Sequence, residues 1–193
     1  MHLCLLLQRI LSYVIPYRYQ LKGYTKLRRC TGITFNPQPF VDHIKASEVI
    51  ESIGTETFNH YFSFAFVRNP WAWALSRYTY AVKNPRHRRH ELMRGFESFD
   101  TYLRWHCNDD ERFYLQKSYV CNSNGEQLVS FVGKQEQLDT DFAHVCHTIG
   151  IDATLPVFNV SNQHSYRDYY GDDSKKLVAD RYAQDIEYFN YTF

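Results

Sequence analysis

The chain has 193 residues, of which 44% are hydrophobic and 17% aromatic, so it is long and apolar enough for one domain with a sizeable core. This composition excludes the low-hydrophobicity, high-charge class of disordered chains. Its 22 Lys and Arg against 21 Asp and Glu leave no overall field that would favour nucleic acid or an acidic membrane surface. Any anion site must therefore come from basic residues that cluster locally.

The first 15 residues, MHLCLLLQRILSYVI, are apolar but are interrupted by Gln8 and Arg9. They fall short of the ~20 residues that a membrane-spanning helix needs, and they lack the charge placement and cleavage site of a signal peptide. We expect an amphipathic or core helix that ends before Pro16, followed by irregular structure over residues 21–39. Membrane association is therefore not expected.

The five cysteines are an odd number, widely scattered, with no CxxC pair. This pattern suggests neither a disulfide framework nor a zinc site, and it favours a reducing compartment. We predict a cytoplasmic protein that binds no metal. If the natural chain begins upstream of Met1, a membrane-associated or Golgi-lumenal location is the alternative.

A buried strand followed by a helix is predicted in the segment FSFAFVRNPWAWALSRYTY, residues 62–80. Residues 62–67 show no polar alternation, which is typical of a strand buried on both faces of a parallel sheet. Asn69 and Pro70 match an N-cap followed by proline at the first helical position. Upstream, residues 43–54 predict a short helix with Ser47 as a possible cap and Gly54 as its end.

The remaining elements continue the alternation of strands and helices. We predict a solvated loop over residues 83–95, a helix over 96–106, a turn over 122–125 and a short strand over 127–133. Two further helices are predicted, one over residues 137–150 and a C-terminal one over 172–189 that is capped by Asp172 or Asp173. Alternating strands and helices favour an α/β fold.

Arg68 follows the predicted strand directly, at the place where open parallel sheets bind ligands and where helix N-termini offer free N–H groups. A guanidinium there can hold a phosphate through two parallel hydrogen bonds, each charge-assisted contact contributing roughly 1.5–3 kcal/mol. Ser76, eight residues further on, could reach another phosphate oxygen. The alternative is a surface arginine and an ordinary helix-face hydroxyl, and spacing alone leaves both open.

The segment FAFVRNPWAWALSRYTY resembles the 3′-phosphate motif of sulfotransferases that use 3′-phosphoadenosine 5′-phosphosulfate (PAPS), above all the carbohydrate sulfotransferase type 2 family. FVGKQEQLDTDFAHVCHTIGI resembles that family's IGRFENL…DF…C…LGI segment, and LPVFNVSNQHSYRDYY with the following helix resembles its C-terminal block. The likeness covers residues 41–191. It implies a P-loop-NTPase-like α/β fold with a parallel sheet flanked by helices, in a single domain over residues 1–193 whose residues 1–40 are divergent and whose residues 41–193 form the family-like core.

The resemblance also implies roles for individual residues. Arg68 and Ser76 would bind the 3′-phosphate of PAPS, while Ser161 and Arg167 would lie in or near a loop that closes over the nucleotide. His43, in VDHIKASE, matches the family's HxTAxE segment and would be the general base, since an imidazole with an ordinary pKa near 6.5 can accept a proton from a sugar hydroxyl. The alternative for His43 is a structural histidine at the edge of a helix.

The family's N-terminal strand and phosphate loop, similar to FIHIPKTAGTS, have no match in this sequence. GYTKLRRCTG does not fit the phosphate-loop pattern GxxxxGK[ST]; Lys26 is the alternative cation in this segment. Trp73 also stands where the family usually has arginine. We therefore expect a sheet without its first strand, and three explanations stay open: a chain that begins downstream of its natural start, a degenerate relative without activity, or an unusual grip on the donor.

The predicted acceptor is a carbohydrate hydroxyl; the alternative function is a non-catalytic relative that binds the nucleotide or a glycan. Homo-oligomerisation is possible because an unpaired sheet edge favours association. The tract RHRRHE, residues 86–91, could attract a sulfated or uronic-acid glycan or be a solvated loop. Gln116 could serve the substrate or the fold. A nucleic-acid-binding role is not expected, because the total charge is near neutral and no known binding motif is present.

Overall fold

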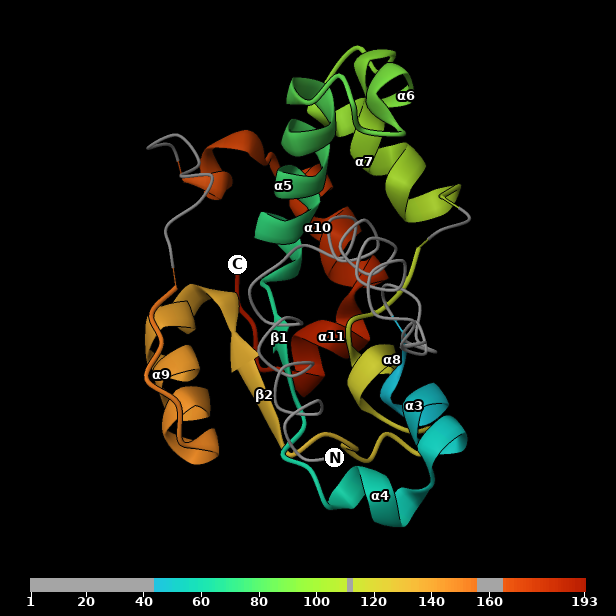
Figure 1. The fold of residues 1–193 in the computed structure, drawn as a ribbon. Coiled ribbons are helices and arrows are strands. Elements are labelled where there is room, and N and C mark those ends of the chain that lie inside the picture. Colours follow the sequence, from blue (N-terminus) through green and yellow to red (C-terminus); the bar gives the residue numbers. More distant parts are fainter. Residues whose placement is uncertain (1–43, 111–112, 156–164) are drawn as a thin grey trace, which may run out of the picture. The chain divides into compact units, whose positions relative to one another are not determined.

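A computed structural model of the protein describes residues 44–110, 113–155 and 165–193, and residues from His43 to the C-terminus form one compact unit. Its sheet has two described strands, β1 (Phe64–Val67) and β2 (Phe131–Lys134), which pair in parallel with Phe64 opposite Phe131 and Val67 opposite Lys134 (Figure 1). The predicted α/β class is therefore confirmed. The expectation of a missing first strand concerns the N-terminal residues, which lie outside the described part.

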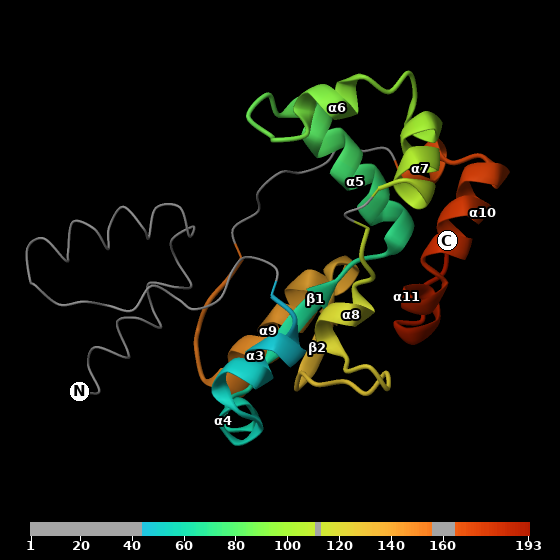
Figure 2. The same cartoon turned by 90° about the vertical axis from the view of Figure 1, so that its right-hand side faces the viewer.

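Helices flank the sheet on both faces. They are α3 (Ala46–Ile53), α4 (Thr55–Asn59), α5 (Pro70–Lys83), α6 (His90–Arg94), α7 (Phe99–Asn108), α8 (Lys117–Val120), α9 (Leu138–Ile149), α10 (Asp172–Arg181) and α11 (Ala183–Tyr188), with 3₁₀ turns η1 (Gln135–Gln137) and η2 (Tyr166–Tyr169). Figure 2 shows α8 beside the strands and α5, α7 and α10 grouped beyond their carboxyl ends.

Two clusters of buried side chains hold these elements together. One gathers on α5, α6, α7 and α10 around Tyr102 and Tyr182, and the other lies between β1, α3, α4, α8 and the C-terminal segment. Burying a large apolar side chain stabilises a fold by about 1.5–3 kcal/mol relative to leaving it exposed. The helical cluster therefore fixes the position of α5 relative to α7 and α10.

Several predicted boundaries are confirmed. The Asn69 side chain accepts from the N–H groups of Trp71 and Ala72, with Pro70 at the first helical position. Gly150 closes α9 in the left-handed conformation, with a φ of 72°, and Gly54 ends α3. Ser98 caps α7.

Other predictions were wrong in detail. Ser47 lies inside α3, whose N-cap is Lys45. Residues 83–95 include the helix α6, whose His90 and Met93 are buried. The second strand begins at Phe131 rather than at residue 127. The C-terminal helix is broken at Tyr182 into α10 and α11, and Gly171 rather than an aspartate is its N-cap.

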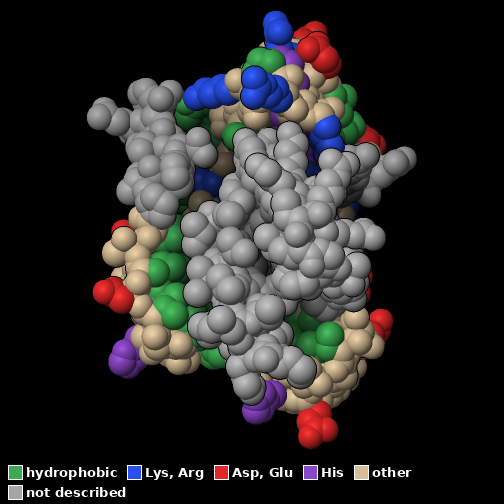
Figure 3. Space-filling view, viewed as in Figure 1, with side chains coloured by type: hydrophobic (Ala, Val, Ile, Leu, Met, Phe, Trp, Pro, Cys, Tyr) green, Lys and Arg blue, Asp and Glu red, His purple; other side chains and the backbone are tan. Residues whose placement is uncertain are grey.

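Charged side chains lie unevenly on the surface. On the face in Figure 3, Lys and Arg side chains gather at the top of the view, around α6 and the end of α5. This concentration contrasts with the near-neutral total charge of the chain.

Candidate functional site

The carboxyl ends of the two parallel strands meet at one edge of the sheet, as the register of Val67 with Lys134 requires. Arg68 and Asn69 leave β1 there, and Glu136 follows β2. The Asn69 N–H donates to Glu136 Oε1 at 2.7 Å, and the Tyr191 hydroxyl donates to Glu136 Oε2 at 3.1 Å. Glu136 thus ties the strand end, the start of α5 and the C-terminal segment together.

The Arg68 side chain is half-buried beside this carboxylate. Burial lowers the pKa of the Arg68 guanidinium from its usual value, and Glu136 and Tyr191 oppose that shift. Within the described part of the chain, the guanidinium forms no ion pair. The charged form of a partly desolvated guanidinium is stabilised further when an anion binds to it.

The backbone of Arg68 is held by one side chain, that of Gln116. Gln116 Oε1 accepts from the Arg68 N–H at 2.8 Å, and Gln116 Nε2 donates to the Arg68 carbonyl at 2.8 Å. Asp185, which is 0% exposed, in turn accepts from the N–H groups of Gln116 and Lys117. Burial raises the pKa of Asp185, while these two N–H groups lower it. Gln116 therefore serves the fold, the second of the two roles that its sequence left open.

The first turn of α5 offers no free N–H group, contrary to the sequence-based expectation. Trp71 and Ala72 donate to the Asn69 side chain, Trp73 donates to the Asn69 carbonyl at 2.8 Å, and Pro70 has no N–H. An anion at this edge must therefore be held by side chains rather than by the helix N-terminus.

Ser76 lies on α5, about 10 Å along the helix from Asn69 at a rise of about 1.5 Å per residue. It is half-buried, and its hydroxyl forms no hydrogen bond within the described residues. An anion that contacts both Arg68 and Ser76 would lie along the flank of the first two turns of α5.

Arg167 lies on η2 and is exposed, with its guanidinium 4.7 Å from the centre of the Tyr166 ring and 5.7 Å from that of Phe193. Tyr170, which directly follows η2, donates its hydroxyl to the Trp71 carbonyl at 2.8 Å, so the end of η2 reaches the start of α5, close to Arg68. The structure thus brings the segment that carries Arg167 to the sheet edge where Arg68 lies. His43 and Ser161 lie outside the described residues, and their assigned roles remain predictions.

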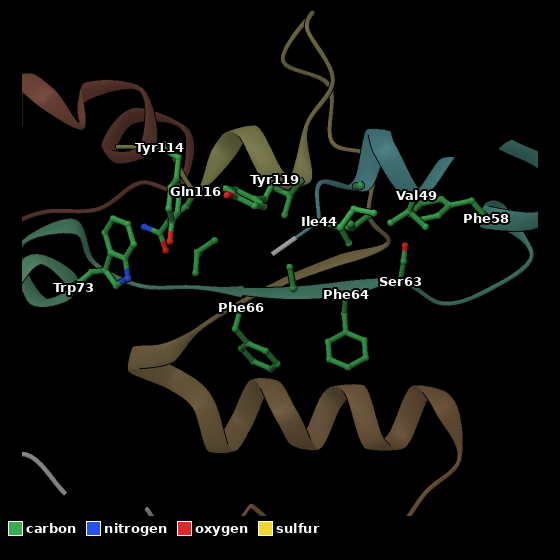
Figure 4. Close-up of a pocket in the computed structure, with 15 residues that line it drawn as sticks. Ile44, Val49, Phe58, Ser63, Phe64, Phe66, Trp73, Tyr114, Gln116 and Tyr119 are labelled. Atoms are coloured by element: carbon green, nitrogen blue, oxygen red, sulfur yellow. The ribbon is translucent and has the colours of Figure 1, made fainter. Parts of the chain in front are cut away.

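Figure 4 shows a pocket of about 430 Å³ along β1. Its wall is apolar at one end, where Ile44, Val49 and Phe58 lie, and aromatic at the end nearer to α5, where Trp73, Tyr114 and Tyr119 lie with Gln116. Phe64 and Phe66 point to the opposite face of the strand, toward α9 (Figure 4). The pocket therefore runs beside β1 up to the residue that holds Arg68 in place.

Trp73, which the resemblance places where the family usually has arginine, is packed between aromatic rings. Its ring centre lies 5.5 Å from that of Tyr114 and 5.8 Å from that of Tyr182, and the Arg77 guanidinium lies 4.8 Å from it. The position thus carries an aromatic surface, with a cation one helical turn further on.

Sequence reasoning missed Lys134 and Glu136. Lys134 ends β2, and its Nζ lies 4.7 Å from the centre of the Tyr191 ring, at the same edge as Arg68. The signal that could have found both residues is their place directly after the second predicted strand, since parallel strands end at a common edge.

No three His, Cys, Asp or Glu side chains gather closely enough to hold a metal ion in the part of the chain that the structure describes. Among the described helices, none combines the length and the apolar character that a membrane crossing needs.

In open α/β sheets with parallel strands, ligands bind at the carboxyl edge, which is the edge where Arg68 follows β1. Comparison with known proteins gives the family. The sequence model of the Sulfotransferase family matches residues 2–192, so the chain belongs to this family, and sulfuryl transfer is the class of reaction that the membership supports.

One relative is an uncharacterized protein of Archaeoglobus fulgidus, which is 31% identical over 117 residues, covering 60% of this chain and 90% of the relative. No solved structure gives a significant match to the chain. Membership in a sulfotransferase family, as the motifs predicted, is thus confirmed, while the carbohydrate type stays a prediction; the match begins ahead of the residues that carry the resemblance.

Proposed function

We propose that the protein transfers a sulfuryl group from PAPS to a carbohydrate hydroxyl. The observation that carries this proposal is Arg68: a half-buried guanidinium at the carboxyl end of β1, without an ion pair among the described residues and with its backbone fixed by Gln116. A cation held in this way is preorganised for an anion, because little order remains to be imposed when the ligand binds.

Arg68 and Ser76 would hold the 3′-phosphate of PAPS. Both fit that group, since one offers a charged fork and the other a hydroxyl without a partner in the described part of the chain. Arg167 and Ser161 would contribute from the loop over the nucleotide. PAPS supplies the sulfuryl group when it is bound, and its remaining anionic groups would add to the attraction of this edge.

His43 would accept the proton of the attacking hydroxyl. A general base must lie within hydrogen-bond reach of that proton, and an imidazole of ordinary pKa is poised for the task near neutral pH. His43 directly precedes the described Ile44, which lines the pocket along β1. Its place in the chain therefore supports a role at that pocket.

A second candidate function is nucleotide binding without turnover. Trp73 favours it, because the ring packed between Tyr114 and Tyr182 occupies a position where a cation is expected in an active relative. Both functions predict binding of adenosine 3′,5′-bisphosphate, and only the first predicts transfer.

The test is a transfer assay with sulfur-labelled PAPS and a panel of neutral and acidic glycans. We expect labelled glycan and stoichiometric adenosine 3′,5′-bisphosphate from the full chain, and loss of both in Arg68→Ala and His43→Ala. His43→Ala should still bind the nucleotide. Nucleotide binding without transfer to any glycan would establish the second candidate, and transfer unaffected by Arg68→Ala would overturn the assignment of the site.

A further inference from the structure

A second pocket lies beside the last two turns of α5, between the loop that leads to α6 and the segment that leads to α8. Its volume is about 380 Å³, and its described lining includes the cationic residues Arg77, Arg88 and Arg89. We call it the arginine pocket. Tyr114 and Tyr119 line both this pocket and the pocket along β1, so the two pockets are neighbours.

Arg77 is held in the wall of the arginine pocket, but one of its hydrogen-bond donors has no acceptor among the described residues. Its guanidinium lies 4.8 Å from the Trp73 ring centre and 5.8 Å from that of Tyr114, and its Nη2 is 3.8 Å from Asp110 Oδ2. Its Nη1 is buried and has no hydrogen-bond partner among the described residues. A buried donor without an acceptor costs free energy, which an oxyanion at this place would recover.

Arg89 is held more tightly. Its two Nη atoms each donate to Asp110 at 3.0 Å, and the Asp110 carboxylate also meets His106 Nδ1 at 3.1 Å. His106 Nε2 lies 2.6 Å from the Tyr182 hydroxyl, so the network is anchored in the helical core. One carboxylate thus faces Arg77 and Arg89 together, while Arg88 is exposed at the rim, so positive charge is in excess among the described residues that line the pocket.

The pKa of His87 responds to this excess of positive charge. Its Nδ1 accepts from the Arg89 N–H at 3.2 Å, and its ring packs edge-on against Tyr80 with centres 5.6 Å apart. The pKa of His87 is lowered first by burial and then by Arg88, Arg89, Arg77 and His90. Glu91, the carboxylate nearest to His90, has a side chain that is 91% exposed and lies 3.9 Å away. The field at His87 is therefore positive.

We propose that the arginine pocket is an anion site that binds a carboxylate or sulfate group carried on a sugar ring of the acceptor. Guanidinium groups match both oxyanions through pairs of parallel hydrogen bonds. Tyr80, Phe113 and Tyr114 give the pocket the aromatic walls on which the apolar face of a ring can lie. Figure 3 shows several Lys and Arg side chains around this end of α5 and α6, with Asp and Glu side chains beside them.

The place of Arg77 connects this site with the proposed donor site. Arg77 directly follows Ser76 on α5, and the shared Tyr114 and Tyr119 lie between the two pockets. A ring anchored by its anion could thus present a neighbouring hydroxyl toward β1. The identity of the ligand as an acceptor rests on the proposed function, whereas the anion site itself does not.

The experiment is a titration of the full chain with glucuronate, glucose 6-sulfate, glucose and inorganic sulfate, followed by nuclear magnetic resonance of the His87 ring. We expect both sugar anions to shift the resonance and to raise the pKa of His87, because they neutralise the surrounding arginines. Glucose should do neither. Binding of glucose as tightly as glucuronate, or of inorganic sulfate as tightly as both sugar anions, would overturn the proposal.

A matched pair of variants tests the location. Arg88→Gln removes an exposed charge that lines the pocket and should weaken glucuronate binding about tenfold or more. Arg86→Gln removes an exposed charge from the same loop, outside the lining, and should change it less than twofold. Equal effects of the two variants would show non-specific attraction and contradict the site.

Adenosine 3′,5′-bisphosphate separates this inference from the proposed function. Its affinity should be the same in the parent protein and in Arg88→Gln. If Arg88→Gln abolishes nucleotide binding, the arginine pocket belongs to the donor and the inference is wrong. If nucleotide binding is absent altogether, the proposed function fails, and the response of His87 to the sugar anions still decides the inference.

Discussion

The side-chain amide of Gln116 pairs with the backbone of Arg68 through two hydrogen bonds of 2.8 Å, one from the Arg68 N–H and one to the Arg68 carbonyl. Because Arg68 lies beyond the end of β1, its backbone has no neighbouring strand to bond with, and the Gln116 side chain supplies these hydrogen bonds. The Arg68 guanidinium stays available for a ligand. Asp185 extends the support through the N–H of Gln116 at 2.8 Å. Asp185, Gln116 and Arg68, which come from three segments of the chain, are thus linked by hydrogen bonds. These bonds set the position of Arg68, the residue proposed to bind the phosphate.

Gln116→Ala should therefore affect both stability and binding. Loss of two hydrogen bonds to partly buried backbone groups is expected to cost about 1–3 kcal/mol. A thermal melt should show a midpoint lower by about 2–4 °C for each kcal/mol, and nucleotide affinity should also fall. Gln137→Ala is the control, because Gln137 is exposed and has no hydrogen-bonding role for its side chain within the described residues. Unchanged stability and affinity in Gln116→Ala would contradict the supporting role.

At Gly133 the structure leaves no room for a larger side chain. A methyl group at Gly133 would lie 2.5 Å from a ring carbon of Phe66 and 3.1 Å from Asp141 Cβ. Gly133→Ala should thus destabilise the protein by about 1–3 kcal/mol through overpacking between β1, β2 and α9. Gly171→Ala is the matched control, since no atom lies within 4 Å of the added methyl group. Denaturant unfolding of the two variants compares them directly.

His106 should make the protein sensitive to acid. Burial, and then Arg77, lowers the pKa of His106 to about 4 from an ordinary 6.5, although Asp110 opposes the shift. The unfolded chain therefore binds a proton at this residue between pH 6.5 and 4 while the folded chain does not, so stability falls as the pH falls through that window. The expected loss is about 3 kcal/mol at 1.36 kcal/mol per pKa unit.

Urea unfolding between pH 7 and 4.5 measures this dependence. His106→Gln cannot take up that proton, so its unfolding free energy should vary less with pH over the same window, whatever its absolute stability. A parent protein and a variant with parallel pH profiles would show that another group controls acid unfolding.

Ser76→Ala isolates the second proposed phosphate ligand. A hydrogen bond to a charged phosphate contributes about 1.5–3 kcal/mol, so affinity for adenosine 3′,5′-bisphosphate should fall about 10- to 100-fold with no change in the melting midpoint. Adenosine 5′-monophosphate, which lacks the 3′-phosphate, should bind the parent protein and the variant equally. An equal loss for both nucleotides would place Ser76 away from the 3′-phosphate.

The strand, turn and first helix of the site could be predicted because their signals are local. The apolar run of β1, the cap Asn69 and the following Pro70 lie within a few residues of one another and act through the backbone. The same holds for the end of α9 at Gly150. Arg68 could be placed at a strand end for this reason.

The contacts that complete the site come from distant segments and could not be read from the pattern. Glu136 meets Asn69 across 67 residues, and Gln116 meets Arg68 across 48. The helix α6 was missed because its buried positions, His90 and Met93, lie within a run of charged residues that resembles a solvated loop. Tertiary packing decided these features.

Binding of adenosine 3′,5′-bisphosphate measured by calorimetry tests the central role of Arg68 most directly. The parent protein should bind the nucleotide, and Arg68→Ala should weaken binding about 10- to 100-fold, as expected for a charge-assisted phosphate contact. Arg94→Ala, which removes an exposed charge from α6, should bind like the parent protein. Nucleotide binding of equal strength in the parent protein and in Arg68→Ala would contradict the account.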